Sequence, residues 1–377
     1  MSLPLPAVLV AALGAALVSF LLGRLLTRHA PGLGLQDLPN ARSSHQTPRP
    51  RGGGVGIVLA FLLALPFAVP LATFGTWNVW LPLVAAVMLA LVGLADDIRG
   101  LGLATRLVAQ SFAVAALLAA LAGSGGGVLE SDTGLFARVA DLAIVAPQLS
   151  ADLAPWLLVA LDALLIPVLL LAALWWINLF NFMDGIDGLA ASQALFMLSA
   201  ALVVKLSAPG NGVADPEILS ATESVATLML AAAVAGFLVL NWPPSRIFMG
   251  DAGSLFLGFS ILALASHDVT LGHMNTWTWL ILGTLFLVDA TTTLLRRWLT
   301  RQHLTTAHRS HLYQRLSRRW GSHRRVTLVY FLLNVTLVFP LAFLAHHAPQ
   351  WAPVVLVVAW LPAAVVAWHA GAGLKET

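Results

Sequence analysis

Residues 154–189 read APWLLVALDALLIPVLLLAALWWINLFNFMDGIDGL. This stretch is the most informative part of the chain for the fold, because a run of apolar residues long enough to cross a membrane is followed directly by acidic residues. Asp162 is the one charged residue between positions 154 and 177. About twenty consecutive apolar residues span the hydrocarbon core of a bilayer as a helix. Asp184 and Asp187 follow this run, and carboxylates so close to lipid are costly enough to indicate a function. The stretch therefore predicts a transmembrane helix that brings carboxylates to a membrane surface.

The composition of the whole chain agrees with this interpretation. The 377 residues are 59% hydrophobic and 10% charged, whereas soluble domains carry about 25% charged residues. The chain is therefore expected to be an integral membrane protein. It contains no cysteine, which excludes disulfides and thiolate metal sites, so any bound metal must use oxygen or imidazole ligands.

Applied along the chain, the same length rule predicts an all-α polytopic bundle of about eleven transmembrane helices, with ten as the alternative. The predicted spans are 3–26, 53–73, 79–95, 105–123, 154–177, 188–207, 222–241, 252–268, 276–297, 326–347 and 352–370. No linker or charge run divides residues 1–377, so we expect a single transmembrane domain. The first run has no basic residue before it and is followed by Arg24 and Arg28, which places the N-terminus outside.

Basic residues are distributed unequally between the two sides of this topology. Eighteen of the twenty Lys and Arg lie in one set of alternate loops or in the C-terminal tail, and Arg138 and Lys205 are the exceptions. Such an excess marks the cytoplasmic side, and most of these arginines need no role beyond marking topology. Five acids lie at the same ends of the spans: Asp96, Asp97, Asp184, Asp187 and Asp251. We expect them to form one acidic, metal-binding site.

The first acidic motif, LADDIRGL, follows a span directly. Adjacent helical residues point about 100° apart, so Asp96 and Asp97 cannot both face one small ligand from a regular helix. At a helix end one could face a metal and the other a second substrate. A solvated helix terminus is the alternative, although the helix dipole disfavours carboxylates at a C-terminus.

The second motif, NLFNFMDGIDGL, is the more specific one. Asn178, Asn181 and Asp184 are spaced by three, as are Asp184 and Asp187, so these side chains are expected to share a helical face. Amide and carboxylate oxygens on one face suit Mg²⁺ and the ribose or base of a nucleotide. A purely structural role for them among Phe, Met and Leu is the weaker explanation.

The third motif, FMGDAGSLFLG, opens another span. Backbone N–H groups at a helix N-terminus bind phosphate, and the helix dipole favours an acid there. Asp251 is therefore either an N-cap residue or the ligand of a cation beside a diphosphate.

Two basic segments complete the set. His308 and His311 are three apart and are expected to lie on one helical face, where Arg309 and Arg315 favour anion binding over metal chelation. The alternative is an amphipathic basic helix lying on anionic headgroups. His303 and His323 are expected to be peripheral.

The other basic segment, PRPRGGGVG, offers Arg49 and Arg51 to a lipid phosphate, or simply marks topology. Asp289, inside a predicted span, either pairs with a basic residue such as Arg296 or supports the site from behind. The sequence leaves both choices open.

Taken in order, PRGGG, DD, NxxNxxDGxDG, GDxGS and the histidine loop resemble the polyprenyl-phosphate N-acetylhexosamine-1-phosphate transferase family, which includes the MraY and WecA enzymes. The likeness runs from about Leu38 to Thr327. It implies an enzyme of the bacterial inner membrane that transfers sugar 1-phosphate from a UDP-N-acetylhexosamine to undecaprenyl phosphate at the cytoplasmic face, releasing UMP. It also implies Mg²⁺ as the cofactor, with Mn²⁺ as a substitute, the lipid bilayer as a partner, no nucleic acid, and a homodimer as one compatible assembly.

Together with the patterns above, the resemblance assigns roles to particular residues. The expected catalytic residues are Asp96, Asp97, Asp184, Asp187, His308 and His311; the expected substrate-binding residues are Asn178, Asn181, Arg49, Arg51, Arg309 and Arg315; the expected metal ligands are Asp251 and Asp97.

The histidine loop separates branches of the family. MraY enzymes carry consecutive histidines there, whereas the HRSHLYQ of this chain is more similar to the WbpL-type branch. That branch starts O-antigen synthesis, a part of lipopolysaccharide assembly, with UDP-N-acetylfucosamine or a related 6-deoxy sugar such as the N-acetylquinovosamine derivative. The alternatives are a peptidoglycan-type MraY transferase and a cation- or proton-coupled secondary transporter, whose site would lie near the bilayer midplane.

Overall fold

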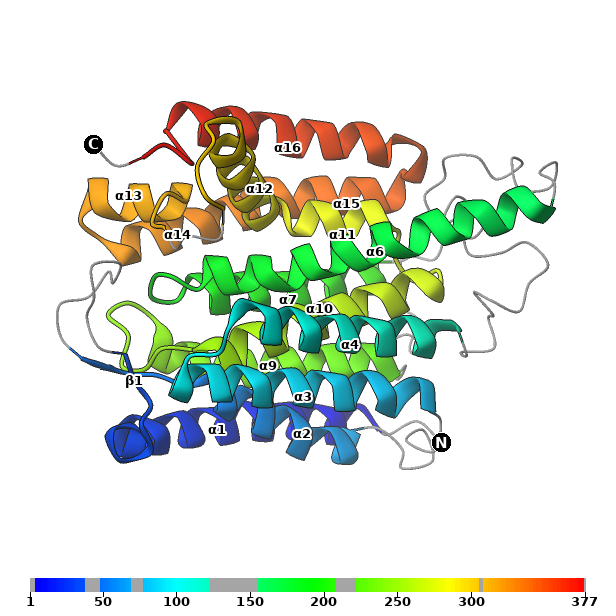
Figure 1. Cartoon of the computed structure of the whole chain (residues 1–377). Coiled ribbons are helices and arrows are strands. Elements are labelled where there is room, and N and C mark those ends of the chain that lie inside the picture. Colours follow the sequence, from blue (N-terminus) through cyan, green and yellow to red (C-terminus); the bar gives the residue numbers. More distant parts are fainter. Residues whose placement is uncertain are drawn as a thin grey trace.

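The computed structural model describes residues 4–37, 48–68, 77–122, 155–207, 222–304 and 308–375, and Figure 1 shows them as a bundle of long helices. Its elements are α1 (Leu5–His29), η1 (Ala30–Leu33), β1 (Gln36–Asp37), β2 (Arg49–Pro50), α2 (Gly54–Ala68), α3 (Trp77–Arg99), α4 (Leu103–Ala122), α6 (Pro155–Met183), α7 (Leu189–Leu206), α9 (Thr222–Asn241), α10 (Asp251–Thr270), α11 (Thr276–Leu282), α12 (Thr284–Leu299), α13 (Leu312–Trp320), α14 (His323–Leu333), the π turn η3 (Asn334–Val338), α15 (Phe339–His347), η4 (Pro349–Trp351) and α16 (Ala352–His369).

The prediction of an all-α, multi-pass membrane protein is confirmed. Within the described residues, nine helices are long and apolar enough to cross a membrane, and one further pair, α11 and α12, passes the same test together. A shorter apolar helix covers Gly54–Pro66. Each of the eleven predicted spans therefore coincides with an apolar helix or helix pair.

Two spans differ from the prediction in ways that affect function. The predicted span 276–297 is broken, because α11 and α12 meet at an angle of 76°. The predicted span 154–177 is too short, since α6 continues to Met183. The extra residues of α6 carry Asn178 and Asn181.

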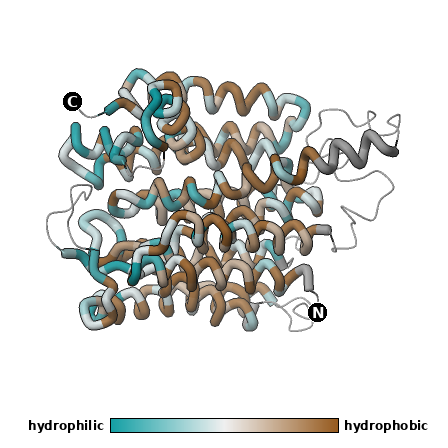
Figure 2. The backbone as a smooth tube through the Cα atoms, in the orientation of Figure 1, coloured by the Kyte–Doolittle hydropathy of each residue, from teal (hydrophilic) through white to brown (hydrophobic). Residues whose placement is uncertain are grey.

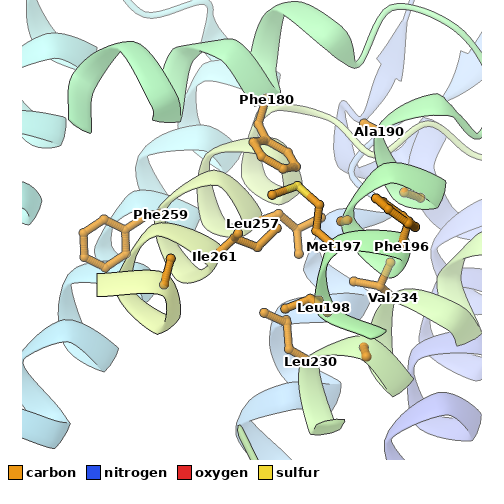
Figure 3. Close-up of a cluster of buried hydrophobic side chains, with 14 of the residues drawn as sticks. Phe180, Ala190, Phe196, Met197, Leu198, Leu230, Val234, Leu257, Phe259 and Ile261 are labelled. Atoms are coloured by element: carbon orange, nitrogen blue, oxygen red, sulfur yellow. The ribbon is translucent and has the colours of Figure 1, made fainter. Parts of the chain in front are cut away.

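The most buried helices lie in the middle of the bundle. In the most apolar 18-residue stretch of each span, about 72% of the residues of α7 and 61% of those of α9 and α10 are buried. The share is 22% in the spans that contain α1 and α16. Figure 3 shows how Phe180, Met197, Val234 and Leu257 meet among these inner helices and α6. Outer helices expose leucine and valine instead, as a lipid-facing surface requires.

Hydrophilic residues gather at one end of the bundle. Figure 2 shows this end on the left, away from the labelled N-terminus, while brown hydrophobic segments dominate the remainder. The α3–α4 turn, the α6–α7 turn, the start of α10 and the helix α13 all lie there (Figure 1). The assignment of this end to the cytoplasm stays a prediction.

Candidate active site

Asp97, near the end of α3, is bound to the start of α10. Its Oδ1 accepts the backbone N–H of Asp251 at 2.9 Å and its Oδ2 accepts that of Ala252 at 3.2 Å. Arg51 reaches the same carboxylate at 2.7 Å, and the side chain of Asp97 is fully buried. The first N–H groups of a helix have no partner within the helix, so Asp97 supplies from α3 the cap that α10 lacks.

Asp251, the first residue of α10, is the acid on which the other groups converge. Its Oδ1 accepts hydrogen bonds from Asn181 at 2.8 Å and from Arg51 at 3.1 Å. Arg106 approaches Oδ2 at 3.6 Å. Asn181 also donates to Ser254 Oγ at 3.2 Å, one turn further along α10. Asp251 is therefore presented toward both arginines rather than capping its own helix.

Asp96 and Asp97 divide between two environments, as the adjacent helical positions predicted. The Asp96 carboxylate accepts the backbone N–H of Leu101 and pairs with Arg106 at 3.0 Å. Sequence reasoning counted Arg106 only as a topology marker, but it contacts two of the predicted acids. Its Nε is buried and, among the described residues, has no hydrogen-bond partner. The available signal for this role is its place in the first turn of α4, directly after the turn that follows the acidic pair.

Asn178 lies one turn before Asn181 on α6 and has a different role. It exchanges two hydrogen bonds with Gln110 of α4, at 2.7 and 3.2 Å, and donates to the carbonyl of Leu174. Gln110 is almost fully buried. The amide pair fixes α4, and with it Arg106, against α6, so the structure does not bring Asn178 to Asp251.

The expectation that Asp184 and Asp187 continue the helical face of Asn181 is wrong. The helix α6 ends at Met183 and the acids lie in the turn before α7. Burial and the carboxylate of Asp251 raise the pKa of Asp184 well above its ordinary value. Asp184 therefore belongs to the Asp251 cluster.

Asp187 faces the other way. It accepts hydrogen bonds from the backbone N–H and hydroxyl of Ser245 at 3.1 and 2.9 Å, and His323 lies 3.3 Å away. Burial alone would raise its pKa, but the interactions with His323 and Ser245 lower it. The expectation that His323 is peripheral is wrong, since the turn before α7 folds back onto α14.

Close backbone approach explains the glycines of two motifs. Gly53 and Gly54 donate to the carbonyls of Phe248 and Met249 at 2.9 Å, so PRGGG runs beside FMGDAGS. A Cβ atom on Gly54 would collide with the backbone of Gly253. The basic Gly-rich loop is therefore part of the site and brings Arg51 to it.

The histidine loop lies beside this cluster, but not on a helix as expected. The helix α13 begins at Leu312, so His308 and His311 precede it, with ring centroids 5.0 Å apart. Burial, aided by His311, lowers the pKa of His308 to about 3, so its imidazole is neutral at physiological pH. The headgroup alternative loses support because Leu312 packs against Ala367, within the protein.

Two of the remaining predicted arginines bind backbone carbonyls. Arg49 donates to Ser245 at 3.0 Å and Arg315 to Ala370 at 3.2 Å, beyond α16. Arg309 offers its own carbonyl to Arg318 at 2.8 Å. Of the four basic residues predicted to bind substrate, the structure places Arg51 within the acidic cluster.

The acidic cluster is suited to a cation whose remaining ligands are phosphate oxygens and water. Within the part of the chain that the structure describes, no three His, Asp or Glu side chains form a complete metal site. Four carboxylates, those of Asp96, Asp97, Asp184 and Asp251, nevertheless face two guanidinium groups. When all four are ionised, the cluster carries an excess of two negative charges, which one divalent cation would balance. Mg²⁺ typically takes one or two carboxylates and completes its shell with phosphate oxygens and water.

Comparison with known protein families identifies the same part of the chain as the acidic cluster. Residues 79–267 match the family described as Glycosyl transferase family 4. This range contains the DD, NxxNxxDGxDG and GDxGS motifs that meet around Asp251.

Three curated relatives illustrate the similarity. The decaprenyl-phosphate N-acetylglucosaminephosphotransferase of Mycolicibacterium smegmatis is 30% identical over 348 residues, covering 87% of this chain and 80% of the relative. The phospho-N-acetylmuramoyl-pentapeptide-transferase of Mycobacterium leprae is 32% identical, covering 77% and 82%. The probable undecaprenyl-phosphate N-acetylglucosaminyl 1-phosphate transferase of Bacillus subtilis is 38% identical over 171 residues, 44% of each chain.

Proposed function

The chain belongs to glycosyl transferase family 4, and from this premise we propose that it transfers N-acetylhexosamine 1-phosphate from a UDP-sugar to a polyprenyl phosphate. The relatives' names support a polyprenyl-phosphate acceptor and an amino-sugar phosphate donor. The observation that carries the proposal is the convergence of Asp96, Asp97, Asp251, Arg51 and Arg106 at one end of an apolar bundle. A lipid-anchored substrate and a soluble nucleotide can meet only at such a surface.

In the proposed reaction, a phosphate oxygen of the lipid attacks the β-phosphorus of the UDP-sugar. The bond from that phosphorus to the bridging oxygen breaks, and UMP leaves with the electron pair. Because the bond from the sugar carbon to oxygen is untouched, the sugar keeps its anomeric configuration. We favour this direct attack over a covalent aspartyl intermediate, because Asp251, on which the other groups converge, already accepts two hydrogen bonds and lies in an ion pair with Arg106.

The chain's own residues address the repulsion between the two phosphate groups. Arg51 and Arg106 place positive charge beside the acidic cluster, and Nε of Arg106 has no hydrogen-bond partner among the residues that the structure describes. Fixed charges that neutralise a developing anion lower the barrier of such a reaction. Asp251 and Asp184 are the proposed holders of Mg²⁺, which would neutralise diphosphate charge when bound.

Asp97 takes a different proposed role from that of a metal ligand. Its two oxygens are committed to the first turn of α10 and to Arg51, so it orients Asp251. Asp96, which pairs with Arg106, is therefore the aspartate of the two that we propose to act on the lipid phosphate.

The sugar and the cellular setting are finer proposals. Two of the relatives are named for N-acetylglucosamine, so UDP-N-acetylglucosamine is the first donor to test. The HRSH loop supports a 6-deoxy-N-acetylhexosamine and an O-antigen role as the alternative. Undecaprenyl phosphate as acceptor, an inner-membrane location and a cytoplasmic site complete the proposal.

The test is UMP release by the purified protein in detergent. We expect release to require a UDP-N-acetylhexosamine, undecaprenyl phosphate and Mg²⁺, and to stop when EDTA removes the metal. A panel of UDP-sugars, including 6-deoxy derivatives, would identify the donor. UMP release that is indifferent to the lipid, or ion-coupled uptake by proteoliposomes without any UMP, would overturn the proposal.

A further inference from the structure

Asp289 is a buried carboxylate that the proposed reaction does not use. It lies in α12 and is 2% exposed. Pairing with Arg296, one of the two roles suggested by the sequence, is wrong: Arg296 donates to the carbonyl of Trp368 at 2.6 Å and stacks on the ring of that residue. Thr293, one turn further along α12, donates to Asp289 Oδ1 at 3.2 Å. The other partners of Asp289 lie on α13 and on α14, where the Tyr330 hydroxyl donates to Oδ2 at 3.1 Å.

The first of these helices is α13, which follows the histidine loop. Asp289 Oδ1 accepts the backbone N–H of Leu312 at 2.8 Å, and Oδ2 accepts that of Tyr313 at 3.0 Å. These are the first two residues of α13. A carboxylate at this end satisfies N–H groups that the helix leaves unpaired and interacts favourably with the helix dipole.

The same carboxylate faces His311. Nδ1 of His311 lies 3.5 Å from Asp289 Oδ1, and the imidazole is 3% exposed. The His311 ring stacks with Phe182 at 6.2 Å and with Tyr313 at 5.8 Å. A carboxylate this close to the ring restricts the orientation of the imidazole, and the His311 side chain also accepts the backbone N–H of Gln314 in the first turn of α13.

Tyr313 connects this arrangement to the acidic turn. Its hydroxyl donates to the carbonyl of Phe182 at 2.8 Å, two residues before Asp184. A Cβ atom on Gly185 would collide with that hydroxyl. The first turn of α13 is therefore held against the turn that carries Asp184.

From these contacts we propose that Asp289 is a positioning residue, which fixes His311 and the first turn of α13 relative to Asp184. The inference rests on the proposed transferase function, in which His311 acts on a substrate. Asp289 itself touches no substrate, and its influence on the reaction passes through His311.

A double-mutant cycle tests this coupling. Asp289→Asn, His311→Gln and the double variant are purified, and kcat and KM are measured with undecaprenyl phosphate and the active UDP-sugar. An amide can accept only one of the two helix N–H groups, so we expect Asp289→Asn to lower kcat about 30-fold while the KM of the UDP-sugar changes less than about threefold. The double variant should be no more than about threefold worse than the more impaired single variant, because both changes remove one function.

Asp268→Asn is the matched control. Asp268 is an equally buried aspartate at the other end of the bundle, where it pairs with Lys205 at 3.0 Å. Its replacement is expected to lower thermal stability, but its effect on kcat should multiply with that of His311→Gln. This contrast separates positioning from a general loss of stability.

A second variant removes the hydrogen bond between Leu312 and Asp289 by changing the donor instead of the acceptor. Leu312→Pro removes the N–H that Asp289 accepts, and proline is well tolerated at the first position of a helix. His311 already has an extended backbone, φ −61° and ψ 150°, which suits a residue before proline. We expect a smaller loss of kcat, again coupled to His311, even if Asp289→Asn does not fold.

The outcomes distinguish the two proposals. Multiplying effects of Asp289→Asn and His311→Gln, or wild-type kcat in folded Asp289→Asn, would overturn the positioning role and leave the transferase function standing. Unchanged kcat in His311→Gln would also overturn it. A wild-type protein that releases no UMP from any UDP-sugar would overturn the transferase function itself.

Discussion

Asp97 of α3 accepts the backbone N–H of Asp251 of α10 at 2.9 Å, across 154 positions of sequence. Asp289 caps α13 in the same manner, through Leu312 and Tyr313. In both places a buried aspartate on one helix satisfies the start of another, and the capped segment carries a predicted site residue. The site is thus oriented by bonds between helices, which makes it sensitive to changes that do not touch a substrate.

Asp97→Asn and Asp251→Asn should differ in stability although both lose transfer. Asp251→Asn is expected to lower kcat at least about 100-fold with a near wild-type melting temperature, because it removes a charge but no cap. Asp97→Asn should also lose about 0.5–2 kcal/mol of stability, the usual value of a helix cap. UMP release and thermal unfolding in detergent measure the two effects; equal melting temperatures would contradict the capping role of Asp97.

Arg106→Gln should impair transfer although sequence patterning treats Arg106 as a topology marker. It removes the contacts to Asp96 and Asp251, and we expect kcat/KM to fall about 10- to 100-fold, the scale of a lost charge-assisted contact. Arg99→Gln is the control, since Arg99 is the exposed last residue of α3, just before the α3–α4 turn. Similar activity in both variants would remove Arg106 from the site.

Gly54→Ala should separate PRGGG from FMGDAGS. The added Cβ collides with the backbone of Gly253, and overpacking of this kind costs about 1–3 kcal/mol. We expect a lower melting temperature and loss of transfer, because Arg51 moves with the loop. Gly14→Ala is the control, since nothing lies within 4 Å of its new Cβ. A Gly54→Ala protein as active as Gly14→Ala would contradict the close approach.

The pH dependence of stability should report His308. In the folded chain the pKa of His308 is about 3, below the ordinary 6.5. Between pH 3 and pH 6.5, the unfolded chain therefore binds a proton at this residue and the folded chain does not. The stability contribution of neutral His308 is therefore complete above about pH 6.5 and is lost as pH falls toward 3. Melting temperatures from pH 7 to 4.5 should fall less steeply in His308→Gln than in the wild type; parallel curves would contradict the buried, neutral imidazole.

The sequence alone determined the class of protein and indicated the acids of its candidate site. Apolar runs of membrane length must form helices, because lipid offers no partner to the backbone, so the spans followed from hydropathy. The acids could be selected for the same reason, since carboxylates beside such runs are costly without a purpose. Even the different partners of Asp96 and Asp97 followed from the roughly 100° step of a helix.

The tertiary structure decided which of these residues meet. Where α6 ends, and hence which way Asp184 and Asp187 face, depends on α10 and α14 packing against the α6–α7 turn. Arg106, His323 and Asp289 had no pattern of their own, because each has a partner 23 to 145 positions away: Asp251, Asp187 and Leu312, respectively. Periodicity describes neighbours within one helix, whereas a cap or ion pair between helices exists only after the bundle has packed.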